Sequence, residues 1–266
     1  RNEISDLGLL PADFGCLGER VGYYGNSLGD HFGVGHIFLA GEAPGLFYGY
    51  VTQGIVQKED ITENGIKYIK QDGSVGYYQT VNKTTPVAGD VKYVDRNGDG
   101  VVDDNDRDII GNPNPDFTYG FQTKVSWKSL SLSASFNGVQ GRDILNVGNR
   151  YNNTPGTKSN NVTRKAFQNM WTDENPSNLY PKSTFVVQNM VMDRYVEDGS
   201  YLRCSDITLS YVLPAKWTNK IGIKNTSVYA SVKNAFVITD YSGYDPEVNS
   251  FAFDGLRPGV DMNSYP

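Results

Sequence analysis

A regular alternation of apolar and polar residues between Phe117 and Phe136 constrains the fold more than any other feature of the sequence. Lys128 and Ser129 read as a two-residue turn, which places Trp127 opposite Leu130 and continues one face into the returning strand. The sequence therefore predicts an antiparallel hairpin with one apolar and one polar surface. The apolar face is predicted to hold Phe117, Tyr119, Phe121, Val125, Trp127, Leu130, Leu132, Ala134 and Phe136. The polar face is predicted to hold Thr118, Gly120, Gln122, Lys124, Ser126, Ser131, Ser133, Ser135 and Asn137.

Two classes of protein share this pattern. A tilted transmembrane β-strand spans a bilayer with ~9 to 11 residues and turns its apolar side to lipid. A strand of a soluble β-sandwich alternates in the same way, with its apolar side toward a second sheet. A transmembrane β-barrel is the leading interpretation, and the sandwich stays open beside it.

Composition supports an all-β fold and excludes several partners. The 266 residues include 29 Gly, 18 Tyr, 12 Phe and 12 Pro, which is typical of many turns and aromatic strands. A net charge of −6 argues against a nucleic-acid partner, whose phosphates require a basic face. No apolar run approaches 18 residues, so a transmembrane helix is excluded. Cys16 and Cys204 are far apart and are expected to be free, mostly buried thiols.

Strand-like segments alternate with connections of unequal length. Strands are predicted at 31–41, 46–57, 117–127, 130–136, 201–213 and 227–239, with a short helix over 162–171. The long polar connections are 58–115, 141–199 and 240–266, and the others are short or modest. Up-and-down strands place alternate connections at the same end, so the long connections would share one end, as the extracellular loops of outer-membrane barrels do.

Both ends of the sequence read as interior positions of a longer polypeptide. Five or six strands cannot close a barrel, and an open sheet would leave unpaired backbone groups at its edges. The rest of the same barrel is therefore expected to supply the missing strands.

A calcium-loop motif lies between Asp95 and Asp106. Oxygen-bearing side chains occupy positions 1, 3, 5, 9 and 12 of the twelve-residue pattern, and Gly100 stands at the position of the sharp turn. Asp at the last position, where this motif has Glu, makes bidentate ligation less assured. The other reading is a surface turn whose carboxylates accept bonds from their own backbone amides. The predicted ligands of a structural Ca²⁺ are Asp95, Asn97, Asp99, Val101 through its carbonyl, Asp103 and Asp106.

No other catalytic or metal-binding group stands out. His31 and His36, the only histidines, fall on opposite faces of a regular strand and make a poor metal pair. No nucleophile, base and acid arrangement or carboxylate pair can be argued, so the protein is predicted not to be an enzyme. The loop aromatics Trp171, Tyr180, Tyr241 and Tyr244 could stack on sugars, although packing is the commoner role of such residues.

Several stretches together resemble one family. Residues 41–57, 89–121, 200–214, 234–248 and 258–266 are similar to the C-terminal part of SusC/RagA-like TonB-dependent outer-membrane transporters of Bacteroidetes. The order and spacing of these stretches also agree, and the resemblance covers nearly the whole chain.

The resemblance implies antiparallel up-and-down strands that form part of a large plugged β-barrel in the outer membrane of a Gram-negative bacterium. It implies import of a glycan or peptide, a SusD-like surface lipoprotein as partner, contact with the TonB complex, and outer-membrane lipid around the barrel. The whole chain, 1–266, is then a C-terminal portion, with the plug and the last strand lying outside it and 58–115, 141–199 and 240–266 as extracellular loops. The alternative is a secreted, calcium-stabilised carbohydrate-binding β-sandwich, and a secreted glycosidase is a third reading.

Overall fold

In a computed structural model, the chain divides into two compact units. The core unit comprises Arg1–Asn114, Asp143–Glu197 and Glu247–Pro266, and the long-sheet unit comprises Pro115–Arg142 and Asp198–Pro246. The structure describes residues 3–5, 15–17, 20–29, 32–154, 161–183, 190–223 and 226–263.

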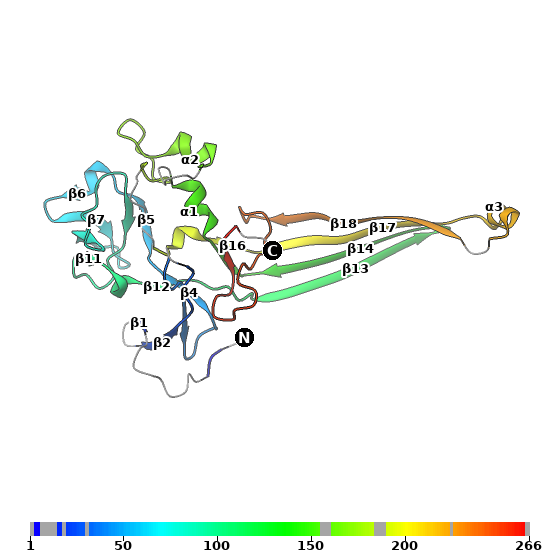
Figure 1. Ribbon diagram of the computed structural model, residues 1–266, viewed down its shortest axis with the longest axis horizontal. Helices are drawn as coiled ribbons and strands as arrows, with labels where there is room; N and C mark the ends of the chain where they lie inside the picture. The colour runs from blue at the N-terminus through cyan, green and yellow to red at the C-terminus, as the bar shows by residue number, and fades with distance from the viewer. Residues whose placement is uncertain are drawn as a thin grey trace. The chain divides into compact units, whose positions relative to one another are not determined.

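The long-sheet unit is one antiparallel sheet of four strands, which lie side by side in the order β13, β14, β17, β18 (Figure 1). The predicted hairpin register is confirmed, because Trp127 pairs with Leu130 and Phe121 pairs with Phe136. Lys128 takes a left-handed φ of 54° in the two-residue turn. The bounds are β13 Phe117–Trp127, β14 Leu130–Gln140, β17 Tyr201–Val212 and β18 Ser227–Thr239.

A bulge in β17 shifts the register between Cys204 and Asp206 against both neighbouring strands. Strict alternation would place Arg203 on the same face as Ile207. The extra residue, Ser205, reverses the alternation, so Leu202 and Cys204 share a face with Ile207 while Arg203 falls on the other. Between β17 and β18 lie α3, Ala215–Thr218, and the short 3₁₀ turn η4, Asn219–Ile221.

The core unit contains several small sheets. Most pairs are antiparallel, as predicted, and the exceptions among the described pairs in named strands are two short parallel ones, β9 with β11 and β15 with β19. The largest sheet has the order β1, β2, β3, β4, β12, with bounds Gly15–Leu17, Arg20–Tyr24, His36–Leu39, Leu46–Gly49 and Asp108–Gly111. The smaller sheets are β6 Ile61–Thr62, β7 Gly65–Ile69 and β8 Val75–Tyr78; β5 Thr52–Ile55 with β10 Val91–Tyr93; β9 Thr80–Val81 with β11 Val101–Val102; and β16 Val196–Asp198, β15 Asp143–Asn146 and β19 Val260–Asp261.

The strands predicted at 31–41 and 46–57 are shorter than expected and do not belong to the long sheet. They form β3, β4 and β5, of four residues each, and side chains on both faces of β4 are buried. The alternation is weak there because Phe47 and Tyr48, which point to opposite faces, both pack inside the core unit. These segments are too short to span a bilayer.

The long polar connections 58–115 and 141–199 contain short strands and helices. Apart from the helix over 162–171, the polar sequence predicted only turns there, but neighbouring segments supply partners for short strand pairs. The predicted helix over 162–171 is present as α2, Arg164–Asn169, and α1 covers Gly148–Asn153. Among the described residues of the core unit, 3₁₀ turns also lie at η1 Lys58–Asp60, η2 Asp104–Asp106 and η3 Asp193–Tyr195.

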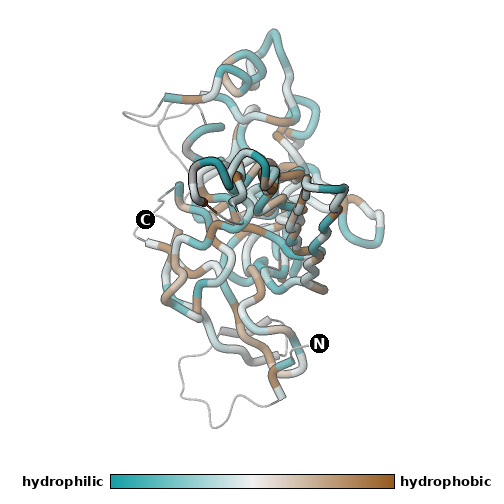
Figure 2. Tube along the Cα trace, turned by 90° about the vertical axis from the view of Figure 1, so that its right-hand side faces the viewer, coloured by the Kyte–Doolittle hydropathy of each residue, from teal (hydrophilic) through white to brown (hydrophobic). Residues whose placement is uncertain are grey.

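Tyrosine builds much of the buried core. Tyr48, Tyr68, Tyr78 and Tyr93 are among the largest fully buried side chains. Their hydroxyls need partners in an apolar interior: Tyr68 donates to the Asp95 carbonyl at 2.6 Å, and Tyr78 accepts from the Tyr93 amide at 3.1 Å. A chain with only 38% hydrophobic residues can therefore still pack a core. Figure 2 shows hydrophobic and hydrophilic positions interspersed at short intervals along the chain.

No helix within the described ranges is both long and apolar enough to cross a membrane.

His36 is fully buried in the core unit, and its Nε2 lies 2.9 Å from the Pro258 carbonyl oxygen. Burial lowers the pKa of His36 to about 4; the bond to Pro258 and the charge of Asp254 oppose the shift, and Arg257 adds to it. Its Nδ1 is buried without a hydrogen-bond partner in the part of the chain that is described, so protonation would create an unsatisfied buried donor.

Acid is expected to destabilise the core unit through His36. His36 binds a proton near pH 6.5 in the unfolded chain but only near pH 4 in the folded chain. The free energy of unfolding is therefore highest above pH 6.5 and falls as the pH drops toward 4. The loss should reach about 3 kcal/mol, at ~1.4 kcal/mol per pH unit. Melting temperatures of the full-length protein between pH 7 and 4 would measure it. His36→Gln, which keeps a donor for Pro258, should lose this component, and an equal pH slope in both proteins would contradict the assignment.

Candidate functional site

The long sheet has one face without any charged side chain. The strand registers continue the predicted face of the hairpin across β17 and β18, where the bulge keeps it apolar. Phe121 stacks on Phe136, with ring centroids 4.6 Å apart, and the ring centroids of Phe136 and Phe236 are 6.4 Å apart. The members of this apolar face are Phe117, Tyr119, Phe121, Thr123, Val125, Trp127, Leu130, Leu132, Ala134, Phe136, Gly138, Gln140, Leu202, Cys204, Ile207, Leu209, Tyr211, Val228, Ala230, Val232, Phe236 and Ile238.

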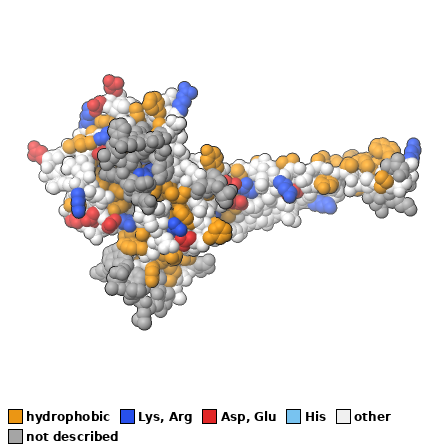
Figure 3. Space-filling view, in the orientation of Figure 1, with side chains coloured by type: hydrophobic (Ala, Val, Ile, Leu, Met, Phe, Trp, Pro, Cys, Tyr) orange, Lys and Arg blue, Asp and Glu red, His pale blue; other side chains and the backbone are white. Residues whose placement is uncertain are grey.

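The opposite, polar face carries the charges of the sheet, on Lys124, Arg203, Asp206 and Lys233. Arg203 donates to Asp245 at 2.6 Å, an interaction that depends on the bulge at Ser205. The serines predicted for this face lie on it, Ser126 on β13 and the other three on β14. In Figure 3 hydrophobic side chains gather along one margin of the sheet, apart from the lysines and arginines.

The exposure of the apolar side chains distinguishes a transmembrane barrel from a soluble sandwich. Phe121 is 51% exposed and Leu132 46% exposed, so neither lies beneath another layer of the described chain. A sandwich strand would bury both residues against a second sheet. An uncharged, exposed apolar face on strands of 11 to 13 residues is what a lipid-facing barrel wall requires.

The Asp95–Asp106 loop is organised by its first and last carboxylates. Asp95, 2% exposed, accepts bonds from the amides of Gly98 at 2.6 Å and Gly100 at 2.9 Å. Gly100 has a φ of 85°, which explains why a glycine stands at this turn. The turn chemistry of the sequence therefore closes the loop through its own backbone.

Asp106 is fully buried and accepts three backbone amide bonds. Arg96 donates at 2.8 Å and Asn97 at 3.3 Å to Oδ1, and Asp103 donates at 2.8 Å to Oδ2. Burial raises the pKa of Asp106, while the three amide bonds oppose the shift because they favour the ionised form. This carboxylate holds the two ends of the loop together.

The remaining predicted ligands lie at the surface of the loop. Asn97, Asp99 and Val101 are exposed, and Asp103 is half-buried and caps η2 by accepting from the Asn105 amide at 2.8 Å. Within the described ranges, no three carboxylate, His or Cys side chains converge as a ligand set. Amide bonds alone can therefore hold the loop, as the alternative interpretation requires, although a carboxylate that accepts them keeps further lone pairs.

A cavity of about 510 Å³ borders this loop within the core unit. Asp104, which belongs to η2, accepts a bond from the Tyr50 hydroxyl at 3.0 Å. The Arg107 guanidinium lies 4.3 Å from the Tyr48 ring centroid and donates to the Tyr48 carbonyl at 2.8 Å. The acid Asp104, the cation Arg107 and the aromatic Tyr50 thus line one cavity beside the loop, a connection that the sequence motif did not reveal.

The structure places the loop aromatics, the cysteines and the histidines of the sequence analysis in different surroundings. Trp171 is buried and donates to Gln57 at 3.0 Å, and Tyr241 is buried, so both serve packing. Tyr244 is exposed, and Tyr180 lines a separate cavity. Cys204 is a buried free thiol, as predicted. His31 and the side chain of Cys16 lie outside the described residues.

Comparison with known proteins gives consistent likenesses, although no family model matches the chain. TonB-dependent receptor P26 of Formosa agariphila is 34% identical over 188 residues, which is 68% of this chain and 18% of the relative. TonB-dependent receptor SusC of Bacteroides thetaiotaomicron is 34% identical over 181 residues, 65% of this chain and 16% of the relative. The RagAB peptide importer in its "open-open" state matches with a TM-score of 0.58 and 25% identity, over 87% of this chain and 22% of that one.

The chain spans about a fifth of the length of the proteins it matches. None of the three names denotes an enzyme, in agreement with the prediction made from the sequence. The likeness to the solved structure also agrees with the predicted fold class.

Proposed function

The chain belongs to the SusC-like TonB-dependent receptors, and from this we propose that the whole protein imports a nutrient across the outer membrane of a Gram-negative bacterium. In this proposal β13, β14, β17 and β18 form part of the barrel wall. Their apolar face contacts lipid, and the polar face with Lys124, Arg203, Asp206 and Lys233 lines the lumen.

The observation that carries the proposal is the charge-free apolar face, exposed over four adjacent strands. Charged side chains are costly at mid-membrane, and the bulge that moves Arg203 to the other face avoids this cost. Unpaired strand edges are also costly in lipid. The outer edges of β13 and β18 would therefore pair with other strands of the whole barrel.

The partner and substrate follow from the relatives as proposals. SusC-like receptors imply a SusD-like surface lipoprotein, and RagAB is described as a peptide importer. We propose an oligosaccharide or a peptide as cargo, with TonB supplying energy and residues 58–115, 141–199 and 240–266 on the extracellular side. The Tyr- and Arg-lined cavity beside the Asp95–Asp106 loop suits either ligand, because aromatic faces stack on sugars and paired polar groups bind peptide backbone.

The test uses the gene that encodes the full-length protein. The protein is expected to fractionate with the outer membrane and to co-purify with a lipoprotein, and its deletion should abolish growth on at least one oligosaccharide or peptide of a nutrient panel. Complementation with the wild-type gene should restore growth. Recovery of the protein in the soluble secreted fraction would contradict the proposal and favour the carbohydrate-binding sandwich.

Calcium binding by the Asp95–Asp106 loop is a second proposal, supported by the ligand spacing in the sequence and by the exposed Asp99. Calcium is expected to raise the melting temperature of the chelator-treated full-length protein, because it would bring repelling carboxylates together. Asp99→Asn should reduce the shift. Exposed Asp72→Asn, in another turn of the same unit, is the matched control. An unchanged melting temperature in millimolar calcium would contradict the proposal.

A further inference from the structure

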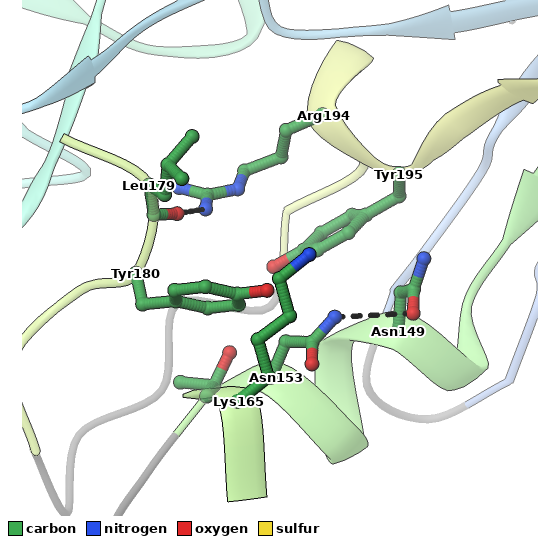
Figure 4. A pocket seen from close by; sticks show the side chains of 8 residues that line it. Asn149, Asn153, Lys165, Leu179, Tyr180, Arg194 and Tyr195 are labelled. Carbon is green, nitrogen blue, oxygen red and sulfur yellow. Dashed lines mark hydrogen bonds between the residues drawn. The ribbon is translucent and has the colours of Figure 1, made fainter. Parts of the chain in front are cut away.

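A second cavity in the core unit, of about 290 Å³, is lined mainly by hydrogen-bond donors. The Lys165 ammonium, the hydroxyls of Tyr180 and Tyr195 and the Asn153 amide group all lie at the same space (Figure 4). They come from three separate segments: the α1–α2 region, residues 179–180, and η3.

Local structure holds most of the segments that carry these groups in place, and the Asn153 amide group donates one bond, to Asn149 at 3.1 Å. Thr163 caps α2 by accepting a bond from the Ala166 amide at 3.1 Å, and Ala166 is fully buried, so the helix that bears Lys165 is anchored. The Tyr180 carbonyl accepts from the Trp171 amide at 3.0 Å. Arg194 donates to the Leu179 carbonyl, which fixes its guanidinium at the rim.

The charge of the lining is entirely positive. Lys165 and Arg194 are the two cations, and no Asp or Glu belongs to the lining residues. Asp193, next to Arg194, is engaged elsewhere, because its carboxylate accepts from the Thr52 amide and hydroxyl at 3.0 and 2.6 Å. In the part of the chain that is described, no carboxylate forms an ion pair with Lys165 or Arg194. Burial raises the pKa of Tyr195, so its hydroxyl stays a donor at neutral pH.

We propose that this cavity binds a carboxylate group of the imported ligand. Two cations with neutral hydroxyl and amide donors match a carboxylate, since charge-assisted hydrogen bonds are the strongest of their kind. The cavity volume suits a single sugar ring or a terminal residue. A uronic acid and the C-terminus of a peptide both present this group. The inference rests on the proposed import function, and it narrows the cargo to acidic oligomers.

The test measures binding of matched acid and neutral probes to the full-length protein in detergent by calorimetry. One pair is tetra-alanine and its C-terminal amide, and the other is β-1,4-diglucuronic acid and cellobiose. At least one acid should bind roughly tenfold or more tightly than its neutral counterpart. Lys165→Met should remove most of this preference, and Tyr180→Phe should weaken it. Lys67→Met, an exposed lysine of β7 in the same unit, should leave it unchanged.

The binding preferences of the wild-type protein and its variants decide between acidic sugars, peptides and no carboxylate site. A preference for diglucuronic acid assigns the site to acidic sugars, a preference for tetra-alanine assigns it to peptides, and both together support a general carboxylate site. Equal binding of acids and neutral probes, or a preference that survives Lys165→Met, would overturn the proposal. Growth and fractionation of wild-type cells test import separately, so a protein that imports nutrients but shows no acid preference would refute only this inference.

Discussion

Phe121→Arg is expected to lower the stability of the full-length protein in lipid by roughly 2 to 4 kcal/mol, the cost of a cation near mid-membrane on the lipid side of a barrel. Phe121 lies near the middle of β13, is half exposed on the apolar face and stacks on Phe136. Denaturant titration of the protein folded into lipid vesicles would measure the loss, with heat-dependent migration on gels as the assay of folding.

Gln122→Arg is the matched control, because it introduces the same side chain one residue away on the polar face. Ser133→Leu tests the same face from β14 and should also be mild. Equal losses for the two arginine variants would show that the faces are assigned wrongly and would remove the main support for a membrane location.

Asp106→Ala is expected to open the Asp95–Asp106 loop. The substitution removes the buried acceptor of three part-buried hydrogen bonds, from the amides of Arg96, Asn97 and Asp103. At a net value of about 1 kcal/mol for each hydrogen bond, the free energy of opening the loop should fall by about 3 kcal/mol. Hydrogen exchange of the segment around residues 95–106 should then accelerate by roughly 100-fold.

Asp99→Ala serves as the control, because the exposed Asp99 carboxylate accepts one backbone amide bond, from Val101 at 2.8 Å, where Asp106 accepts three, so exchange should accelerate far less when a chelator is present. Asp106→Asn should fall between the two, since an amide oxygen can still accept from part of the set. The experiment is done with and without chelator. An effect of Asp106→Ala that appears only with calcium would contradict the role of the amide bonds and would favour the metal-bound loop.

The hairpin was the most predictable part of the fold. Its faces follow from a period of two, and its register follows from a two-residue turn, both of which depend only on neighbours in the sequence. The Asp95–Asp106 loop was predicted as a calcium site, with closure by its own amides as the alternative; its turns are closed by Asp and Asn side chains two to five residues from the amides they bind, and the calcium site stays a prediction.

Long-range packing determined which predicted strands belong to the long sheet, which the alternation of residues could not predict. The segments 31–41 and 46–57 read as strands of the spanning sheet, but β3 and β4, which form there, bury side chains on both faces in the core unit. The bulge at Ser205 was also missed, because a register shift shows only when β17 is paired with β14 and β18. The donors of the proposed carboxylate site come from separate short segments, so no repeating sequence pattern connects them.

By itself, then, the sequence determined the two surfaces of the Phe117–Gln140 hairpin and the closed turn around Asp95, because strand periodicity and turn chemistry act over a few residues. Only the tertiary structure decided that the apolar face extends uncharged across β17 and β18, and that Lys165, Tyr180 and Arg194 line one cavity. The physical reason is that strand pairing and burial depend on residues far apart in the chain, whose meeting no local pattern records.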